Sequence, residues 1–290
     1  MAANYTRLHV IACSLSRFFY RLLLNFIQNL KFRDYIVQPS PLHQVLFGVV
    51  SFLNLLQSHN QFGIIAVQNT FMTTMQQELQ TRWDDLTSFV SSQIRDKWWQ
   101  KICDEYGKRP FRGFEHLLIM LRAFDKYKDH LRDRYATAMA IFFKNIIYDP
   151  LADDNADKSE KVFREFAQET TFDSENYVAD LISKSGLSST GAHLNANQSG
   201  EDDAHFLMDF DMAYLAEPFD KFVELERAQR KEYSHFDEEK YAQQRKQVLK
   251  TFLVIPNIYA TTPLREDLEG RARDNIQREV ELLEKGERKD

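Results

Sequence analysis

The stretch RYATAMAIFFKNIIY, residues 134–148, is the most apolar segment with helical spacing in this chain of 290 residues. A segment that is apolar on most of its sides predicts a helix in the interior of a protein rather than on its surface. Asp149 and Pro150 follow it, and because the residue before a proline disfavours the helical conformation, we expect the helix to end there. This segment is the predicted centre of the fold.

Amphipathic segments lie on both sides of that centre. Those with apolar residues at helical intervals are 75–94, 96–107, 113–131, 158–170, 174–186, 205–217, 218–236, 238–255 and 265–290. Residues 188–203, rich in Ser, Gly, Asn and Asp, predict a loop. Many helices with short links and no sustained strand alternation predict an all-α helical bundle that forms one domain over residues 72–290.

The charge of the chain is divided unevenly along its length. Residues 1–77 contain five basic residues and one acidic residue, a net charge of +4, whereas residues 78–290 contain 32 basic and 42 acidic residues, a net charge of −10. An acidic main segment argues against nucleic acid as a partner. Cys13 and Cys103 are too few and too distant for a disulfide framework, so we expect a reducing, cytoplasmic environment.

Residues 1–71 form a separate N-terminal extension in this interpretation. Residues 1–33 contain Arg and Ser but no acidic residue, which is typical of a mitochondrial transit peptide. An interfacial helix that contacts a membrane, or an extension that is not part of the native protein, are the alternatives. Arg17 and Arg21 interrupt the apolar stretch 8–30, and the run 44–56 is short for a membrane span.

Short motifs follow one another through residues 79–285. The longest are RPFRGFEHLLIML (109–121), FFKNIIYDP (142–150), DFDM (209–212) and RKEY (230–233). Their order and spacing resemble those of the predicted metal-dependent phosphohydrolases of the HD superfamily. The other matching positions are Trp83, Trp99, Tyr106, Asn155, Ser159, Ala272 and Asn275, with either Thr190 and His193 or Ser185 and Ser188 at one further motif.

The resemblance implies an HD-type helical domain with a divalent cation, such as Mn, Mg or Zn, that activates a water for attack on a phosphate ester. The family holds this ion with one His, an adjacent His-Asp pair and a later Asp. The positions that match these ligands are His116, Lys144, Asn145 and Asp211. Accessory positions that the same motifs suggest are Arg109, Arg112, Asp209 and His193.

The chain departs from the family at the ligands themselves. Lys144 and Asn145 stand where the family has His and Asp, and Arg112 replaces a further His. A protonated lysine offers no lone pair to a metal, and the formal charge of the four positions changes from −2 to 0. Because one charge pair at 4 Å is worth roughly 4 kcal/mol at an effective dielectric of about 20, we expect no metal cofactor. The Lys144 ammonium is instead predicted to occupy the place of the cation and to pair with Asp211.

Three functions are compatible with these residues. The first is a degenerate enzyme that binds a nucleotide or another phosphorylated small molecule through Lys144 and Arg112, or binds a protein partner or a second copy of itself. The second is an active phosphohydrolase whose metal site is rebuilt from His116, Asp211, His193, Asp209 and acidic residues of 149–157. The third is a structural domain whose cleft has closed.

Overall fold

The centre of the fold is helix α5 (Arg134–Lys144), as the sequence predicts. The side chain of Asp133 accepts a hydrogen bond from the Ala136 amide at 2.8 Å and so caps the first turn. Every residue from Ala136 to Lys144 is buried. Because the helix is buried all round, its neighbours must cover all of its faces.

The computed structural model describes residues 74–286, which lie within one compact unit, Val67–Asp290. The expectations for the extension 1–71, including the transit peptide and the membrane contact, lie outside the described residues. Before α5 the chain is helical over 74–86 and then forms α3 (Ser92–Tyr106), α4 (Phe114–Tyr127) and the short 3₁₀ helix η1 (Lys128–His130). After α5 come α6 (Asn155–Glu169), α7 (Glu175–Lys184), α8 (Gly191–Leu194), α9 (Asp203–Met212), η2 (Ala213–Ala216), α10 (Phe219–Glu232), α11 (Glu238–Val254) and α12 (Thr262–Lys285).

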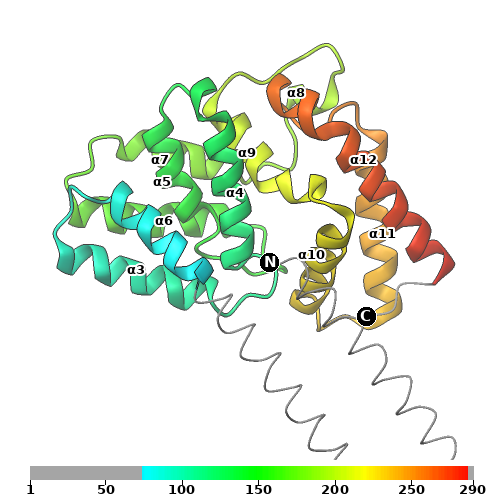
Figure 1. The fold of residues 1–290 in the computed structure, drawn as a ribbon, viewed down its shortest axis with the longest axis horizontal. Helices are drawn as coiled ribbons and strands as arrows, with labels where there is room; N and C mark the ends of the chain where they lie inside the picture. Colours follow the sequence, from blue (N-terminus) through cyan, green and yellow to red (C-terminus); the bar gives the residue numbers. More distant parts are fainter. Residues whose placement is uncertain (1–73, 287–290) are drawn as a thin grey trace, which may run out of the picture. The chain divides into compact units, whose positions relative to one another are not determined.

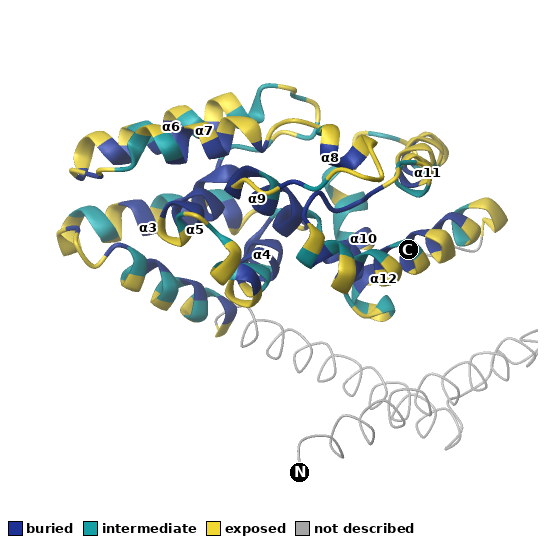
Figure 2. Ribbon diagram, turned by 90° about the horizontal axis from the view of Figure 1, so that it is seen from above, coloured by how far each residue is buried: buried dark blue, intermediate teal, exposed yellow. Residues whose placement is uncertain are grey.

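The described residues are all helix, turn and loop, so the predicted all-α fold is confirmed. Figure 1 shows α3, α5, α6 and α7 in one half of the domain, α10, α11 and α12 in the other, and α4 and α9 between them. Helix α7 packs on both α5 and α6, whereas α11 packs on α12. Figure 2 shows that α5 and α9 are dark blue along most of their length, while the outer helices are buried on one side only.

Aromatic side chains fill the half of the core that lies around α5. The Trp83 ring meets the Phe142 ring edge-on with centroids 5.3 Å apart, and the Trp98 ring meets that of Phe166 at 5.5 Å. Both indoles donate hydrogen bonds, Trp83 to the Arg95 carbonyl and Trp98 to Glu169. The core around α5 is therefore aromatic, and the indole N–H groups at its edge are satisfied.

Several element boundaries differ from the sequence prediction. Helix α5 ends at Lys144 rather than at Asp149, because the Ile147 amide, which would bond to the Phe143 carbonyl in a continued helix, donates to Ser159 Oγ at 3.1 Å instead. The carbonyls of Asn145 and Ile146 then accept hydrogen bonds from Arg109. The predicted helix 75–94 is broken by a turn at 87–90. The predicted loop 188–203 contains one helical turn, α8, which is capped by Thr190 and His193.

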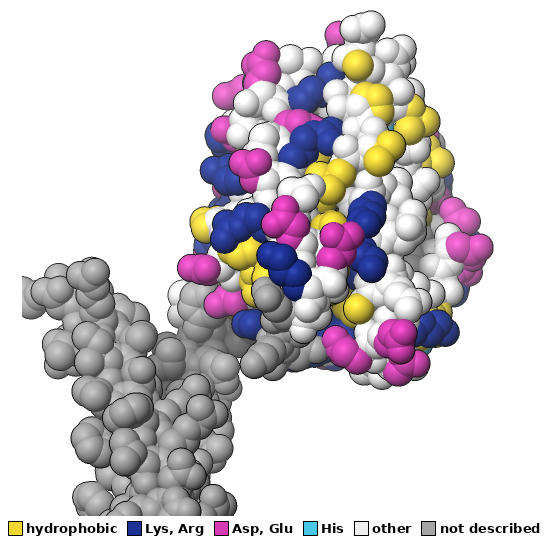
Figure 3. All heavy atoms as spheres, turned by 90° about the vertical axis from the view of Figure 1, so that its right-hand side faces the viewer, with side chains coloured by type: hydrophobic (Ala, Val, Ile, Leu, Met, Phe, Trp, Pro, Cys, Tyr) yellow, Lys and Arg dark blue, Asp and Glu magenta, His cyan; other side chains and the backbone are white. Residues whose placement is uncertain are grey.

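The face formed by α11 and α12 is mixed in character. Figure 3 shows basic, acidic and hydrophobic side chains interspersed on it, without an extended patch of one charge. Val248 and Val254 of α11 are 45% and 83% exposed. A homodimer through this face remains a prediction. Over residues 74–286, no helix has the length and apolar character needed to cross a membrane.

Candidate functional site

The four positions that the resemblance assigns to the metal come together on the carboxylate of Asp211. Lys144 Nζ lies 3.3 Å from Asp211 Oδ2, and Asn145 Nδ2 donates to Oδ1 at 3.1 Å. Arg112 Nη1 donates to Oδ1 at 2.8 Å and to Oδ2 at 3.1 Å. His116 Nε2 lies 3.0 Å from the Asp211 carbonyl oxygen. The predicted pairing of Lys144 with Asp211 is confirmed.

The place where α5 ends explains how neighbouring residues reach the same carboxylate. Successive side chains on a helix point about 100° apart, so Lys144 and Asn145 would diverge within a regular helix. Lys144 is the last helical residue of α5 and Asn145 is its C-cap, with φ −115° and ψ 22°. The change of backbone conformation at Asn145 therefore brings both side chains to Asp211.

The electrostatics of the cluster follow from its burial. The side chains of Asp211, Arg112 and Lys144 are 11%, 19% and 6% exposed. Burial alone raises the pKa of the Asp211 carboxyl, but Arg112 and Lys144 reverse this and hold it well below its usual range. Burial lowers the pKa of Lys144 against the opposing pull of Asp211. Asp211 is therefore an ionised hub that two cations share.

His116 is a buried, neutral member of the cluster. Its ring packs against Phe111 and Tyr214, with centroids 5.2 and 6.0 Å away, and burial lowers the pKa of its imidazole to about 4. Because a carbonyl oxygen only accepts hydrogen bonds, the contact with the Asp211 carbonyl requires the proton to be on Nε2. The nitrogen that faces Asp211 therefore has no lone pair to offer.

The donor set does not fit a divalent cation held in the manner of the family. Lys144 and Arg112 present only N–H donors to the shared carboxylate, and Asn145 also turns its amide N–H toward it. In the part of the chain that the structure describes, no group of three or more His, Cys, Asp or Glu lies close enough to hold a metal ion. The residues around Asp211 suit an anion better than a cation.

Backbone contacts hold the loop that carries Arg112. The Glu232 Oε1 atom accepts hydrogen bonds from the amides of Phe111 and Arg112, both at 2.9 Å. Gly113 follows, and a Cβ there would lie 2.4 Å from the Arg109 carbonyl oxygen, so the turn requires glycine. Arg109 binds the carbonyls at the end of α5, which positions Asn145, but it does not contact Asp211 itself.

Half of the Arg112 guanidinium has no hydrogen-bond partner among residues 74–286. Nη1 is used by Asp211, whereas Nη2 makes no hydrogen bond to a described residue and Nε is buried without a partner. Nε and Nη2 together form one of the two edges with which arginine binds carboxylate or phosphate in a bidentate manner. The guanidinium lies over the ring of Tyr148, 5.0 Å from its centroid. Arg112 therefore offers an unused anion-binding edge beside Lys144.

Asp209, two residues before Asp211, does not join this cluster. Its Oδ1 accepts a hydrogen bond from the Ala260 amide at 2.7 Å, and its Oδ2 accepts from the amide and hydroxyl of Thr261 at 2.8 and 2.6 Å. Burial raises the pKa of Asp209 to about 7, although these hydrogen bonds oppose the shift. The contacts of Asp209 tie α9 to the start of α12.

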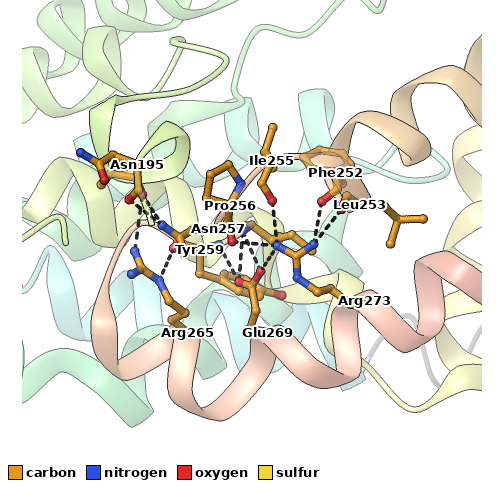
Figure 4. A network of polar contacts seen from close by, with 12 residues as sticks. Asn195, Phe252, Leu253, Ile255, Pro256, Asn257, Tyr259, Arg265, Glu269 and Arg273 are labelled. Atoms are coloured by element: carbon orange, nitrogen blue, oxygen red, sulfur yellow. Dashed lines mark hydrogen bonds and ion pairs between the residues drawn. The ribbon is translucent and has the colours of Figure 1, made fainter. Parts of the chain in front are cut away.

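The loop that binds Asp209 is held by the polar network of Figure 4. Arg273 donates to the carbonyls of Phe252, Leu253, Ile255 and Pro256, at 2.9 to 3.3 Å, and so caps the end of α11. Glu269 accepts from the amides of Ile258 and Tyr259. Arginine and glutamate from α12 thus fix the backbone of 255–261.

His193 lies in the same region as Asp209 and the loop 255–261, away from Asp211. Its Nδ1 accepts a hydrogen bond from the Thr190 amide at 3.0 Å, and its carbonyl accepts one from the Asn257 amide. Burial lowers the pKa of His193, and the nearby His205 adds to the shift. Of the four accessory positions, the structure therefore places Arg112 in contact with Asp211, and Arg109 in contact with the backbone of Asn145. Asp209 and His193 instead form hydrogen bonds away from Asp211.

Three residues beside the cluster had no predicted role. Glu232 holds the Arg112 loop, Tyr148 lies under Arg112, and Tyr214 covers His116. Glu232 lies in the motif RKEY and Tyr148 in FFKNIIYDP, so their position in the motifs was the available signal. Tyr214 belongs to no such motif, and its place depends on a buried ion pair between Glu226 and Arg245, whose Nη2 lies 3.3 Å from the Tyr214 hydroxyl.

Comparison with known proteins adds no relative. No family model, no curated protein and no solved structure matches this chain. The likeness to the HD-superfamily phosphohydrolases therefore rests on the order of the sequence motifs.

Proposed function

We propose that this chain is an HD-like domain that has lost its metal and binds the phosphate group of a small molecule with protein cations alone. The observation that carries the proposal is the Nε–Nη2 edge of Arg112, which has no hydrogen-bond partner in residues 74–286 and lies beside Asp211 and Lys144. A guanidinium edge of this kind binds a phosphate through two parallel hydrogen bonds.

The arrangement of charges supports an anionic ligand. Arg112 and Lys144 share the single carboxylate of Asp211, which leaves this trio with a formal surplus of one positive charge. Asp211 fixes both cations in place before a ligand arrives, so less side-chain entropy is lost on binding. The exposed part of the Arg112 side chain, 19%, gives a ligand access to the cluster.

A rebuilt metal site, the alternative from the sequence, is less well supported. It requires Asp209 and His193 to join His116 and Asp211, but Asp209 is engaged by Ala260 and Thr261. His193 is engaged by Thr190. Both would have to abandon buried hydrogen bonds, which costs about 1–3 kcal/mol for each group left unsatisfied.

The direct test is calorimetric titration of the full chain with methyl phosphate, with and without EDTA, beside an assay for phosphatase activity with Mn²⁺. We expect saturable binding that EDTA does not change, and no metal-dependent turnover. The Arg112→Lys variant keeps a charge for Asp211 but loses the bidentate edge, and we expect it to bind about tenfold more weakly. Lys184→Arg, in an exposed pair with Asp180, is the matched control and should bind normally. Metal-dependent turnover, or no binding of methyl phosphate, would contradict the proposal.

A second experiment tests the origin of the site. The triple change Arg112→His, Lys144→His and Asn145→Asp replaces the three non-ligands around Asp211 with the residue types of the family. We expect the triple variant to take up a divalent metal, measured by elemental analysis after dialysis against Mn²⁺ or Zn²⁺. A variant that is folded but free of metal would show that these positions are not a converted metal site.

A further inference from the structure

Histidine takes the place of the usual glutamate or glutamine at the starts of α8 and α9. In a capping box, the side chain of the third helical residue accepts a hydrogen bond from the amide of the N-cap residue. Helix α8 has His193 at this position and α9 has His205, and both capping boxes are complete. A ring nitrogen accepts such a bond only while it is unprotonated. Both helix starts therefore depend on an acceptor that a proton can remove.

The cap of α8 fixes the protonation state of His193. The Thr190 amide donates to His193 Nδ1 at 3.0 Å, so this nitrogen carries a lone pair and the ring is neutral. The Thr190 hydroxyl, 3.0 Å from the same nitrogen, already accepts a hydrogen bond from the His193 amide. A proton on Nδ1 would face the Thr190 N–H and deprive it of its acceptor. Protonation of His193 thus breaks the capping box.

The cap of α9 differs in the charge of its first residue. Its N-cap is Asp202, whose amide lies 3.4 Å from His205 Nδ1, a longer and weaker contact than that of His193. A proton on His205 would gain an ionic partner in the Asp202 carboxylate of its own cap, whereas the Thr190 hydroxyl carries no charge. Of the two caps, that of α8 is therefore the one that a proton disrupts.

The charged groups around His193 come from α9 and α12. His193 is 5% exposed, and this burial lowers the pKa of its imidazole. His205 of α9 and Arg265 of α12 add to the shift, and Glu269 of α12 opposes it. Glu269 accepts hydrogen bonds from two backbone amides and pairs with Arg273, so the carboxylate that acts on His193 is already engaged.

The first turn of α8 also fastens the segment 188–200 to the loop 255–261. The His193 carbonyl accepts a hydrogen bond from the Asn257 amide at 3.2 Å. The Asn257 side chain donates to the carbonyls of Ala192 and Asn195 at 2.8 and 3.1 Å (Figure 4). These acceptors belong to α8 and its C-cap, so they keep their positions only while the turn is intact. The cap of α8 therefore controls the attachment of the whole segment.

We propose that His193 is a proton-sensitive switch: when its ring is protonated, α8 loses its cap and the segment 188–200 detaches from the loop 255–261. An ordinary histidine has a pKa of about 6.5, and burial lowers that of His193 in the closed state. The stabilisation of the closed state is thus fully present above about pH 6.5 and is lost as the pH falls below it. The switch lies away from Asp211, so it is independent of phosphate binding.

Asp209 binds the same loop but responds to acid in the opposite sense. Its carboxylate accepts from the amides of Ala260 and Thr261, and burial raises its pKa to about 7. A group whose pKa is raised in the closed state favours that state more strongly as the pH falls. Detachment in acid therefore has its origin in His193 rather than in Asp209.

Hydrogen exchange of the full chain, followed by mass spectrometry, measures the detachment. Labelling times are scaled at each pH so that the intrinsic exchange of a free amide stays constant. Between pH 7.5 and 5.5 we expect the protection of residues 188–200 to fall about tenfold, because opening takes up one proton below a pKa of about 6.5. Residues 134–144 of α5 should keep their protection and serve as the internal reference.

His193→Gln separates the effect of the proton from that of the structure. Glutamine is a usual residue of the capping box and accepts from the Thr190 amide through its side-chain oxygen, but it does not titrate. We expect residues 188–200 to stay protected at pH 5.5 in this variant, and methyl phosphate to bind as it does to the unchanged protein. His205→Gln makes the same change in the other cap and should leave the tenfold fall in place.

Three results would overturn the proposal. They are protection of 188–200 that does not depend on pH in the unchanged protein, an equal fall in His193→Gln, and a fall that His205→Gln abolishes. If His193→Gln does not fold, nitrogen NMR of the histidine-labelled unchanged protein replaces it. The proposal then requires an imidazole that is unprotonated at Nδ1 at neutral pH and whose protonation coincides with the loss of protection. The absence of such an imidazole would contradict it.

Discussion

Asp209 and Asp211 lie two residues apart on α9, but their surroundings are opposite in kind. Asp211 meets two cationic side chains and an amide, and these hold its pKa below the usual range against burial. Asp209 meets backbone amides and the hydroxyl of Thr261, and burial raises its pKa to about 7. Asp211 gathers charged and amide side chains around itself, and Asp209 binds the backbone of a loop. The same residue type on one helix thus binds side-chain cations in one place and backbone amides in the other.

The largest effect should come from removing the charge of Asp211. Asp211→Asn leaves Arg112 and Lys144 buried beside each other without a counter-ion, which should lower the free energy of unfolding by about 3–5 kcal/mol. Urea denaturation measures this. Adding Lys144→Met to Asp211→Asn should restore part of the loss, because one of the two unpaired cations is then gone. Purely additive losses would show that the three groups do not act as one cluster.

The next largest effect concerns the pH dependence of stability, to which His116, beside Asp211, and Asp209 contribute in opposite directions. Burial lowers the pKa of His116 to about 4, so the unfolded state binds more protons between about pH 4 and 6.5. The free energy of unfolding therefore rises with pH in this window, by about 3 kcal/mol. Burial raises the pKa of Asp209 to about 7 from 3.8, so the native state binds more protons in nearly the same window. The contribution of Asp209 to the free energy of unfolding therefore falls by about 4 kcal/mol as pH rises. This fall largely cancels the rise that His116 causes.

Asp209→Asn should reveal the hidden slope of His116. In this variant the free energy of unfolding should rise between pH 4 and 7 by about 3 kcal/mol, whereas in the unchanged protein it should change little, whatever the absolute stability of the variant. Denaturation at a series of pH values gives the two curves. His116→Gln is the complementary variant. Its free energy of unfolding should fall between about pH 4 and 7, because only the contribution of Asp209 remains. Parallel curves for all three proteins would contradict the assignment of these two groups.

A smaller effect is expected when Lys144 alone is removed. Lys144→Met keeps the volume of the side chain, and Asp211 retains Arg112 and Asn145, so we expect a loss of about 1–3 kcal/mol. Lys184→Met, in an exposed pair with Asp180, is the matched control, and its loss should be below about 0.5 kcal/mol. Equal stability of Lys144→Met and the unchanged protein would contradict the idea that the Lys144 ammonium takes the place of a metal ion as a partner of Asp211.

The smallest effect concerns the loop that binds Asp209. Arg273→Lys keeps a charge for Glu269, but one ammonium cannot reach the four carbonyls that the guanidinium binds at the end of α11. We expect a loss of about 1 kcal/mol in the free energy of unfolding and no change in methyl phosphate binding. A loss of binding would show that the second region takes part in the site.

The fold followed from the sequence because it depends on local patterns. The apolar period of 134–148 predicted the buried helix, and Gly107, the last residue of the predicted helical segment 96–107, is the C-cap of α3. The early end of α5 was not predictable from Asp149 and Pro150, because the Ile147 amide, which would have continued the helix, donates to Ser159 of helix α6. Helix existence is a local property, whereas this boundary depends on a long-range contact.

The site was predictable as a set of positions but not as a set of roles. The order of the motifs grouped His116, Lys144, Asn145 and Asp211 as candidate metal positions. Charge complementarity predicted the pairing of Lys144 with Asp211, which the structure shows. The same reasoning placed Asp209 and His193 beside them. Their actual partners are backbone amides of Ala260, Thr261 and Thr190, and backbone partners have no signature in residue type.

The two backbone clamps of the site have a consequence for design. Arg109 holds the carbonyls at the end of α5, and Glu232 holds the amides before α4, so the shape of this corner does not depend on the side chains that line it. Residues other than Arg112, Lys144 and Asn145 therefore hold the backbone of this corner, and substitutions at these three positions should leave its shape in place. For the same reason, the corner is a suitable scaffold into which an anion receptor or a metal centre can be engineered by a few point changes.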